Sequence, residues 1–459
     1  MEINWIQEVE KRKDALLTDT QNFLRIKSVL NMEEATAGAP FGTGVAEALS
    51  FMLNKGEADG FVAKNVDGYA GHLEMGEGQE LIGILCHVDV VPEGDGWTSD
   101  PYGADIRDGN IYARGAIDDK GPTIAAYYAM KIVKELELPL QKRVRMILGA
   151  DEESEWRCVD HYFKKEEMPT MGFAPDADFP IINAEKGISA VHITMKPHVS
   201  KGGTVLQEFT SGRRLNMVPD YARAVLLSER AGEIAEQFAS YGNAAVQGQQ
   251  VTLEMKGISA HGSTPEKGEN AGMLLAAFLQ KQELDEGGTA FVSFAMEAFQ
   301  DDTRGKRLGV AYADDITGDL TINVGTMSYQ AQEGGAFGLN IRYPVTTDVD
   351  KMVSKIALYA EKRGFKAKQT SNSKPHHVAK EHMLIQTLQR VYEEQTGERA
   401  ELLAIGGGTY ARSLQAGVAF GPLFPGKEDL AHQKDEYIEI EDLVKATAIY
   451  AQAIYELAK

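Results

Sequence analysis

The sequence predicts an α/β protein: a discontinuous α/β domain with a mostly parallel sheet, and an inserted α+β domain. Three observations lead to this class. The 459 residues exceed the usual length of one domain. Short apolar runs alternate with helical patterns at both ends of the chain, which is typical of α/β sheets. From about residue 187 the pattern changes to strands with alternating apolar and polar residues. We expect residues 1–186 and 380–459 to form the discontinuous domain, and residues 187–379 the inserted one.

The amino-terminal segment alternates helices and strands as a parallel sheet requires. Its most informative element is the nearly continuous apolar run 81–86, because such a run suits a strand that is covered on both faces. Gly121-Pro122 opens a helix with proline in its first turn. In chain order we expect a helix over residues 3–25, a helix over 42–55, strands over 61–66, 71–75 and 81–86, a helix over 121–138 and a strand over 144–149.

The middle of the chain has strands that alternate apolar and polar side chains, as strands do when one face is exposed. We expect strands over residues 189–195, 251–255, 320–324 and 337–341, with helices over 230–240, 270–281 and 349–363. The polar stretch 369–374, followed by Pro375, is interpreted as a connection. The α/β pattern then resumes with a helix over 383–396, a strand over 418–420 and a helix over 440–457.

The composition is that of an ordinary globular protein, with 43% hydrophobic and 25% charged residues. A net charge of −21 disfavours binding to nucleic acid or to an anionic membrane surface. No run approaches 18 uninterrupted apolar residues, and the first residues lack the basic start and apolar stretch of an export signal. Only two cysteines occur, so no disulfide framework is expected. We therefore expect a cytoplasmic protein that binds neither nucleic acid nor a membrane.

Three clusters of imidazole and carboxylate side chains stand next to apolar strands or a helix start. His87 ends the run 81–86, and Asp89 lies on the same side of that strand. Asp118-Asp119 precedes the helix at 121, and Asp151-Glu152-Glu153 follows the strand at 144–149. Each alone has an ordinary explanation: an incidental strand end, a helix cap or solvated acids. Together they favour a shared cation site at the edge where α/β sheets bind ligands.

Two further candidates, Asp176 and His432, also follow apolar segments. Two imidazoles and three carboxylates suit two divalent ions, with one carboxylate bridging them and a water held between. Hydrolysis is therefore the leading chemistry.

These residues belong to motifs that resemble a known family, the dinuclear zinc peptidases and deacylases. That family includes carboxypeptidase G, aminoacylase, succinyl-diaminopimelate desuccinylase and the carnosine dipeptidases. The motifs span nearly the whole chain: His87-Val88-Asp89, Asp118-Asp119-Lys120-Gly121, Asp151-Glu152-Glu153, Pro175-Asp176-Ala177 and His432. Within it, the chain looks like the PepV-type bacterial dipeptidases, on the segments 94–97, 114–122, 183–187, 259–265 and 405–410.

The resemblance implies a role for each residue in the first domain, which would be catalytic. His87 and Glu153 would bind different metal ions and Asp118 would bridge them, although motif alignment alone decides between Asp118 and Asp119. Glu152 would be the general base that takes a proton from a metal-bridging water, and Asp89 would orient His87. The implied metal ligands are His87, Asp118, Glu153, Asp176 and His432.

The inserted domain would be a lid that covers the substrate. His261 is implied as an oxyanion donor, and its ordinary reading is a surface loop histidine. Asn216 and Arg342 match the family's substrate contacts, and an arginine can clamp a carboxylate with two parallel bonds. In the segment 406–409, Gly408 and Thr409 are interpreted as letting backbone amides approach the substrate, since no P-loop lysine follows.

The sequence thus indicates a metal-dependent dipeptidase that hydrolyses unblocked dipeptides. The alternatives are an N-acyl amino acid deacylase or desuccinylase of the same superfamily, and a catalytically silent binding protein. Two divalent ions per chain are expected, zinc before manganese or cobalt, because the nitrogen and oxygen ligands admit each. A monomer is expected, since the insertion has room for roughly two ordinary lid units.

Overall fold

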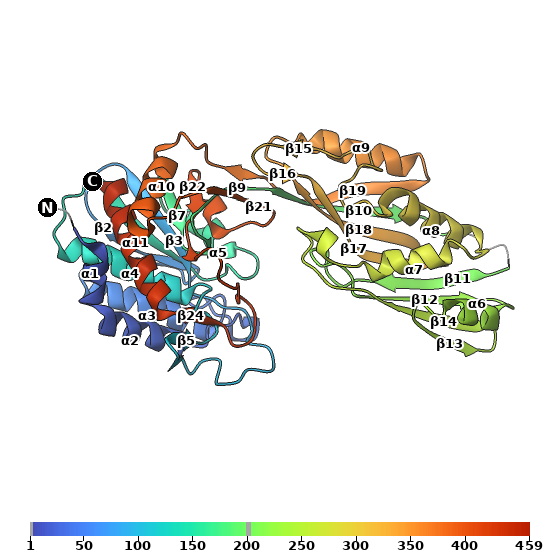
Figure 1. Ribbon diagram of the computed structural model, residues 1–459, viewed down its shortest axis with the longest axis horizontal. Helices are drawn as coiled ribbons and strands as arrows, with labels where there is room; N and C mark the ends of the chain where they lie inside the picture. Colours follow the sequence, from blue (N-terminus) through green and yellow to red (C-terminus); the bar gives the residue numbers. More distant parts are fainter. Residues whose placement is uncertain (1–2, 199–202) are drawn as a thin grey trace. The chain divides into compact units, whose positions relative to one another are not determined.

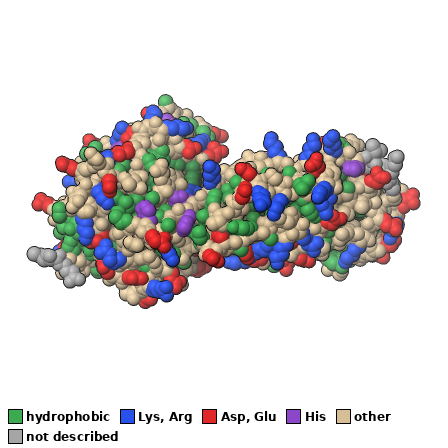
Figure 2. Space-filling model, turned by 90° about the horizontal axis from the view of Figure 1, so that it is seen from above, with side chains coloured by type: hydrophobic (Ala, Val, Ile, Leu, Met, Phe, Trp, Pro, Cys, Tyr) green, Lys and Arg blue, Asp and Glu red, His purple; other side chains and the backbone are tan. Residues whose placement is uncertain are grey.

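The computed structural model describes residues 3–198 and 203–459, which form two compact units (Figure 1). The first unit comprises residues 1–183, 377–403 and 408–459, and the second comprises residues 184–376 and 404–407. The chain therefore leaves the first unit twice, for residues 184–376 and again for residues 404–407, and returns to it each time. Acidic and basic side chains are interspersed over the face of the molecule in Figure 2.

The first unit is built on one large sheet in the order β1-β2-β6-β3-β7-β22-β9-β20, with β21 paired to β9. The central pairs β6–β3, β3–β7 and β7–β22 are parallel, whereas β1–β2 and β2–β6 are antiparallel. The expected α/β class with a mostly parallel sheet is confirmed. The strands are β1 (Val62–Val66), β2 (Ala70–Met75), β3 (Leu81–His87), β6 (Arg143–Gly149), β7 (Met171–Ala174), β9 (Ile181–Glu185), β20 (His376–His377), β21 (Leu402–Ile405) and β22 (Gly417–Ala419).

Helices cover both faces of this sheet, which explains why β3 is buried along its whole length. On one face, Leu73 of β2 packs against Gly56 of α3, and Phe173 of β7 stacks on Tyr450 of α11. On the other face, Tyr162 of α5 packs against His72. The elements of the unit outside the large sheet are α1 (Trp5–Glu10), α2 (Lys13–Leu24), η1 (Met32–Glu34), α3 (Thr43–Ala58), β4 (Asp105–Arg107), β5 (Asn110–Tyr112), α4 (Lys120–Glu135), α5 (Arg157–Tyr162), β8 (Ala177–Asp178), α10 (Met383–Thr396), η3 (Tyr410–Ser413), β23 (Pro422–Leu423), β24 (Tyr437–Glu439) and α11 (Ile440–Ala458).

The expectation of one continuous helix over residues 3–25 is wrong, because the chain forms α1 and α2 with a break between them. Arg12 has non-helical backbone angles at this break. Its guanidinium donates to the carbonyl oxygen of Glu8 at 2.7 Å and to the Glu8 carboxylate at 3.1 Å. The side chain thus satisfies a carbonyl at the end of α1, as capping groups do.

The second unit is built on an eight-stranded antiparallel sheet in the order β13-β14-β12-β11-β17-β18-β10-β19, with a separate two-stranded sheet of β15 and β16. Its hydrophobic core joins the sheet to residues of α6, α7, α8 and α9. The elements are β10 (Gly187–Met195), β11 (Val205–Ser211), β12 (Tyr221–Leu227), α6 (Ala231–Phe238), β13 (Asn243–Gln247), β14 (Gln250–Lys256), η2 (Pro265–Lys267), α7 (Ala271–Leu279), α8 (Glu286–Phe299), β15 (Ala313–Asp314), β16 (Gly318–Asp319), β17 (Thr321–Gln330), β18 (Gly334–Tyr343), α9 (Val349–Glu361) and β19 (Phe365–Ser373).

The stretch expected as a connection at 369–374 is instead mostly strand, because β19 continues to Ser373 and pairs with β10. It is an edge strand with much of its length exposed, so its polar side chains carry no apolar alternation that reveals a strand. Within the described ranges 3–198 and 203–459, the helices are too short or too polar to cross a membrane.

Candidate metal centre

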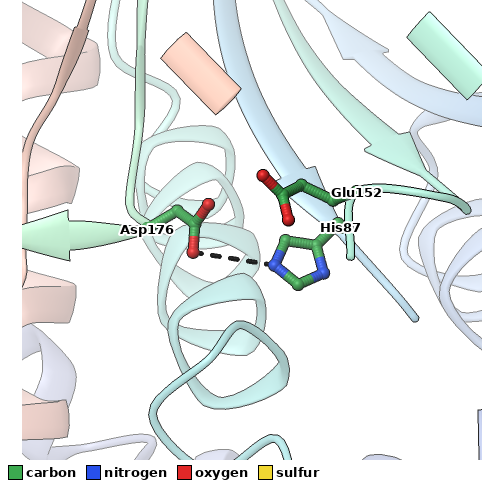
Figure 3. Close-up of side chains that lie close together, drawn as sticks. All are labelled: His87, Glu152 and Asp176. Carbon is green, nitrogen blue, oxygen red and sulfur yellow. Dashed lines mark ion pairs between the residues drawn. The ribbon is translucent and has the colours of Figure 1, made fainter. Parts of the chain in front are cut away.

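Three neighbouring parallel strands bring four of the candidate residues of the first unit to one edge of its sheet. His87 is the last residue of β3, Glu152 and Glu153 follow β6, and Asp176 follows β7. Because β6, β3 and β7 are adjacent and parallel, their carboxyl ends lie at the same edge. Figure 3 shows His87, Glu152 and Asp176 approaching one another there.

One group of side chains forms around His87, whose side chain is fully buried. Its Nε2 atom lies 3.0 Å from Oδ1 of Asp118 and 3.6 Å from Oδ1 of Asp176. Potential ligand atoms of His87, Glu152 and Asp176 all lie within 4.8 Å of one another. An imidazole nitrogen and carboxylate oxygens at this spacing are a donor set suited to a divalent cation.

A second group forms around the other oxygen of Asp118. Nε2 of His432 lies 3.0 Å from Oδ2 of Asp118 and 3.0 Å from Oε2 of Glu153. His432 has a left-handed backbone, with φ of 64°, and its side chain is 52% exposed. Asp118 therefore presents one carboxylate oxygen to each imidazole.

The neighbouring residue Asp119 points into the protein. It is fully buried, and its Oδ2 accepts the backbone N–H of His87 at 3.0 Å and the hydroxyl of Thr123 at 3.2 Å. The Asp118–Asp119 peptide bond is cis. Of the two adjacent acids, Asp118 thus has the position between the imidazoles, and Asp119 supports the end of β3.

Asp89 contacts His87 in a way that the sequence did not specify. Nδ1 of His87 lies 2.9 Å from the backbone carbonyl oxygen of Asp89 and 3.6 Å from its carboxylate. The carboxylate instead accepts the backbone N–H groups of Glu152 and Glu153, each at 3.1 Å. Asp89 therefore fixes the imidazole through its main chain and both glutamates through its side chain.

The accumulated negative charge of the site shows in the pKa values of its carboxyl groups. Burial raises the pKa of Asp176 to about 6 and that of Glu153 to about 7, and it raises the pKa of Glu152 well above its usual range. The charge of Asp176 raises the pKa of Glu152 further. Bonds to Asp118 and Glu153 raise the pKa of His432 to about 11. Carboxylates gathered in a buried site call for a compensating cation, and divalent ions fit these donors.

Tyr410 supports this site, although no role was expected for its side chain from the sequence. Its ring lies edge-on to that of His87, with centroids 6.1 Å apart, and its hydroxyl lies 2.9 Å from Sγ of Cys158. A Cβ atom on Gly149, at the end of β6, would lie 1.7 Å from the Tyr410 hydroxyl oxygen. Glycine at this strand end was the available signal for a close approach.

Three further candidates belong to the second unit. The carbonyl oxygen of Asn216 accepts the N–H of Gly262, next to His261, at 2.7 Å. Arg342 is 5% exposed; its Nε donates to Oδ1 of Asn340 at 2.8 Å, and its Nη1 donates to the carbonyl oxygen of Gly406 at 2.9 Å.

The imidazole of His261 is held by its own loop. Nδ1 of His261 lies 2.7 Å from Oγ of Ser263. Burial, and then the charge of Arg342, lowers its pKa. Gly408 and Thr409 belong to the first unit, where Thr409 is buried at the start of η3.

The sequence pattern of the peptidase family M20/M25/M40 matches residues 83–456. The chain belongs to this peptidase family. It is therefore a hydrolase of a metal-dependent family, as the motifs indicated. The matched range begins within β3 and contains all the residues of both imidazole groups.

Relatives in this family share the full length of the chain. The chain is 57% identical to "Putative dipeptidase YtjP" of Bacillus subtilis (strain 168), with 100% of each chain covered. It is 42% identical to "Putative dipeptidase" of Staphylococcus epidermidis, with 99% of each covered. Among solved structures, aminopeptidase PepT from Bacillus cereus has a TM-score of 0.59 at 17% identity, covering 97% of this chain and 99% of that one. Human carnosine dipeptidase 1 has a TM-score of 0.58 at 15% identity, covering 99% and 98%. These structures share the fold of the M20-family chain.

Proposed function

We propose that this M20-family protein is a metal-dependent dipeptidase that hydrolyses unblocked dipeptides with two divalent ions. The observation that carries the proposal is the position of Asp118, whose two carboxylate oxygens each lie 3.0 Å from a different imidazole. That arrangement suits a carboxylate shared by two ions. The names of the relatives that match the whole chain support the dipeptide as substrate.

Five side chains would hold the ions. His87 and Asp176 would bind one ion, Glu153 and His432 the other, and Asp118 both. Zinc is favoured by the two imidazoles, and manganese or cobalt would accept the same nitrogen and oxygen donors. When bound, such ions polarise a carbonyl group and make water more acidic.

Glu152 is the proposed general base and acid. Its backbone N–H is fixed by Asp89, and its carboxyl group lies near His87 and Asp176 without being needed in either proposed ligand set. A carboxyl group in this position can take a proton from water and later give it to the leaving amine. In the second unit, Arg342 would bind the substrate carboxylate, with Asn216, His261, Gly408 and Thr409 as further substrate contacts.

A substrate panel on the metal-loaded protein tests the proposal. A free-amine dipeptide should be hydrolysed far faster than its N-acetyl or N-succinyl analogue. Chelation should abolish hydrolysis, and added Zn²⁺, Mn²⁺ or Co²⁺ should restore it. Faster hydrolysis of the acylated analogue would favour a deacylase, and bound metal without turnover would favour a binding protein.

The role of Arg342 has its own test. Wild type should prefer a dipeptide over its C-terminal amide, and Arg342→Ala should lose most of that preference, because an arginine binds a carboxylate with two parallel charge-assisted bonds. Arg223→Ala is a suitable control, since Arg223 pairs with Glu208 on another strand of the same unit. Equal discrimination by wild type and Arg342→Ala would place the substrate carboxylate elsewhere.

We also propose that the protein works as a cytoplasmic monomer. The pairing of β11 with β17 in the middle of the eight-stranded sheet supports the monomer, because one chain supplies both halves of the sheet. Light scattering across a concentration series should give the mass of one chain. A dimer, or activity regained on mixing His261→Ala with Glu152→Ala, would contradict it.

A further inference from the structure

A buried carboxylate outside the proposed ligand set lies four residues after His432. Glu436 is fully buried, and its oxygens are engaged by protein donors. Oε1 accepts the backbone N–H of Ile117 at 2.9 Å and that of Asp118 at 3.3 Å. Oε2 accepts from Nη1 of Arg114 at 2.5 Å. Glu436 therefore contacts the main chain of the residue whose carboxylate lies between the two imidazoles.

The partner of Glu436 joins a third segment to this contact. Arg114 is 1% exposed, and its Nη2 donates to the carbonyl oxygens of Pro92 at 3.4 Å and Glu93 at 3.3 Å. Its guanidinium lies 5.4 Å from the ring centroid of Trp97. The backbone N–H of Ala113 also donates to the carbonyl oxygen of Glu436 at 3.0 Å. Main-chain and side-chain bonds thus join the segments 92–97, 113–118 and 432–436.

The position of the segment that contains His432 depends on bonds of this kind. The His432 side chain is 52% exposed, so packing does little to fix its imidazole. Asp435 has a left-handed backbone, with φ of 57°, and its Oδ1 accepts both the N–H and the hydroxyl of Thr98, at 2.8 and 2.9 Å. Together with Glu436, this holds the carboxyl side of the His432 turn.

We propose that Glu436 is a positioning residue that holds Asp118 and His432 in the relative positions that ligands of one metal ion require. It does so by bonding the main chain of Asp118 while belonging to the same short turn as His432. The inference rests on the proposed function, because it concerns residues that would bind the ions. Outer groups that orient metal ligands typically change metal affinity by about 10- to 100-fold when removed.

The test measures Zn²⁺ binding by metal-free protein in competition with a chromophoric chelator. Glu436→Ala should weaken the binding of one ion by about 10- to 100-fold. Glu436→Gln should lose less, because its amide oxygen can still accept the N–H groups of Ile117 and Asp118, but its affinity should still fall below that of wild type, because its amide NH2 group cannot accept from Nη1 of Arg114. The matched control is Glu439→Gln: Glu439 lies three residues after Glu436, at the end of β24, and pairs with Lys427 at 2.6 Å. This variant should leave affinity unchanged.

A purely structural role predicts a different pattern. It would lower the Tm of the metal-free variants and leave their Zn²⁺ affinities, and the absorption spectrum with Co²⁺, as in wild type; that result would overturn the proposal. If Glu436→Ala does not fold, Glu436→Gln decides, and wild-type affinity in it refutes the positioning role. Failure of wild type to bind Zn²⁺ would overturn the proposed function and this inference together, whereas two-ion binding that is unaltered in the variants would overturn this inference alone.

Discussion

The replacement Asp89→Asn separates the two tasks that the structure assigns to Asp89. Its backbone carbonyl, which contacts Nδ1 of His87 at 2.9 Å, is unchanged by the replacement. Its carboxylate, 2% exposed, accepts the N–H groups of Glu152 and Glu153. An asparagine keeps one acceptor oxygen and turns a donor toward the other N–H. The variant should therefore disturb the two glutamates and leave the imidazole held.

The expected size of the effect follows from the one bond lost. A hydrogen bond to a charged group contributes about 1.5–3 kcal/mol net, so the free energy of unfolding should fall by roughly that amount. If the same free energy holds Glu152 and Glu153 in their working positions, kcat/KM falls by roughly 10- to 150-fold, since about 1.4 kcal/mol corresponds to a factor of ten.

The assay combines urea unfolding of metal-free protein, metal content and dipeptide hydrolysis. Asp285→Asn is the matched control: Asp285 is 1% exposed, accepts the backbone N–H of Leu206 at 2.9 Å and belongs to the second unit. It should lose stability with little change in metal content. If Asp89→Asn loses stability but keeps kcat/KM and metal content within about twofold of wild type, the argument that its carboxylate positions the glutamates is refuted.

Three further outcomes are expected. Glu152→Gln should keep near-normal metal content while kcat falls by about 10²- to 10⁴-fold, the usual contribution of a general acid–base group; loss of metal in proportion to activity would make Glu152 a ligand instead. Burial lowers the pKa of His72 from 6.5 to about 4, so the unfolded chain binds more protons between these values. The free energy of unfolding of metal-free wild type, measured relative to that of His72→Gln in urea titrations, should therefore decline as the pH falls from about 6.5 to about 4; a difference between the two proteins that does not change with pH would contradict the reasoning. Gly149→Ala places a Cβ 1.7 Å from the Tyr410 hydroxyl oxygen and should cost about 1–3 kcal/mol and weaken metal binding, while Gly232→Ala, with nothing within 4 Å, should not; equal Tm values would contradict the clash.

Elements with strong local patterns were predictable from the sequence. The run 81–86 was expected as a buried strand because both of its faces are apolar, and it forms β3. Helix α10, Met383–Thr396, has the bounds expected from its apolar spacing. By contrast, α8 was not expected, since Gly287-Gly288 weakens helix propensity at its start. It forms because Phe291 and Phe294 pack into the core of the second unit, which overrides local preference.

The sequence by itself determined the peptidase family and the candidate ligands. The short motifs that follow apolar strands can be recognised by residue type and spacing alone. It left open whether Asp118 or Asp119 lies between the imidazoles, since adjacent acids look alike in one dimension. Only the tertiary structure decided this, because the Asp119 carboxylate accepts the backbone N–H of His87, whereas the Asp118 carboxylate lies beside the imidazoles of both His87 and His432. The contact of Glu436 with the main chain of Ile117 and Asp118 could not be predicted from the sequence either. It joins residues more than 300 positions apart through backbone N–H groups, which every residue but proline carries.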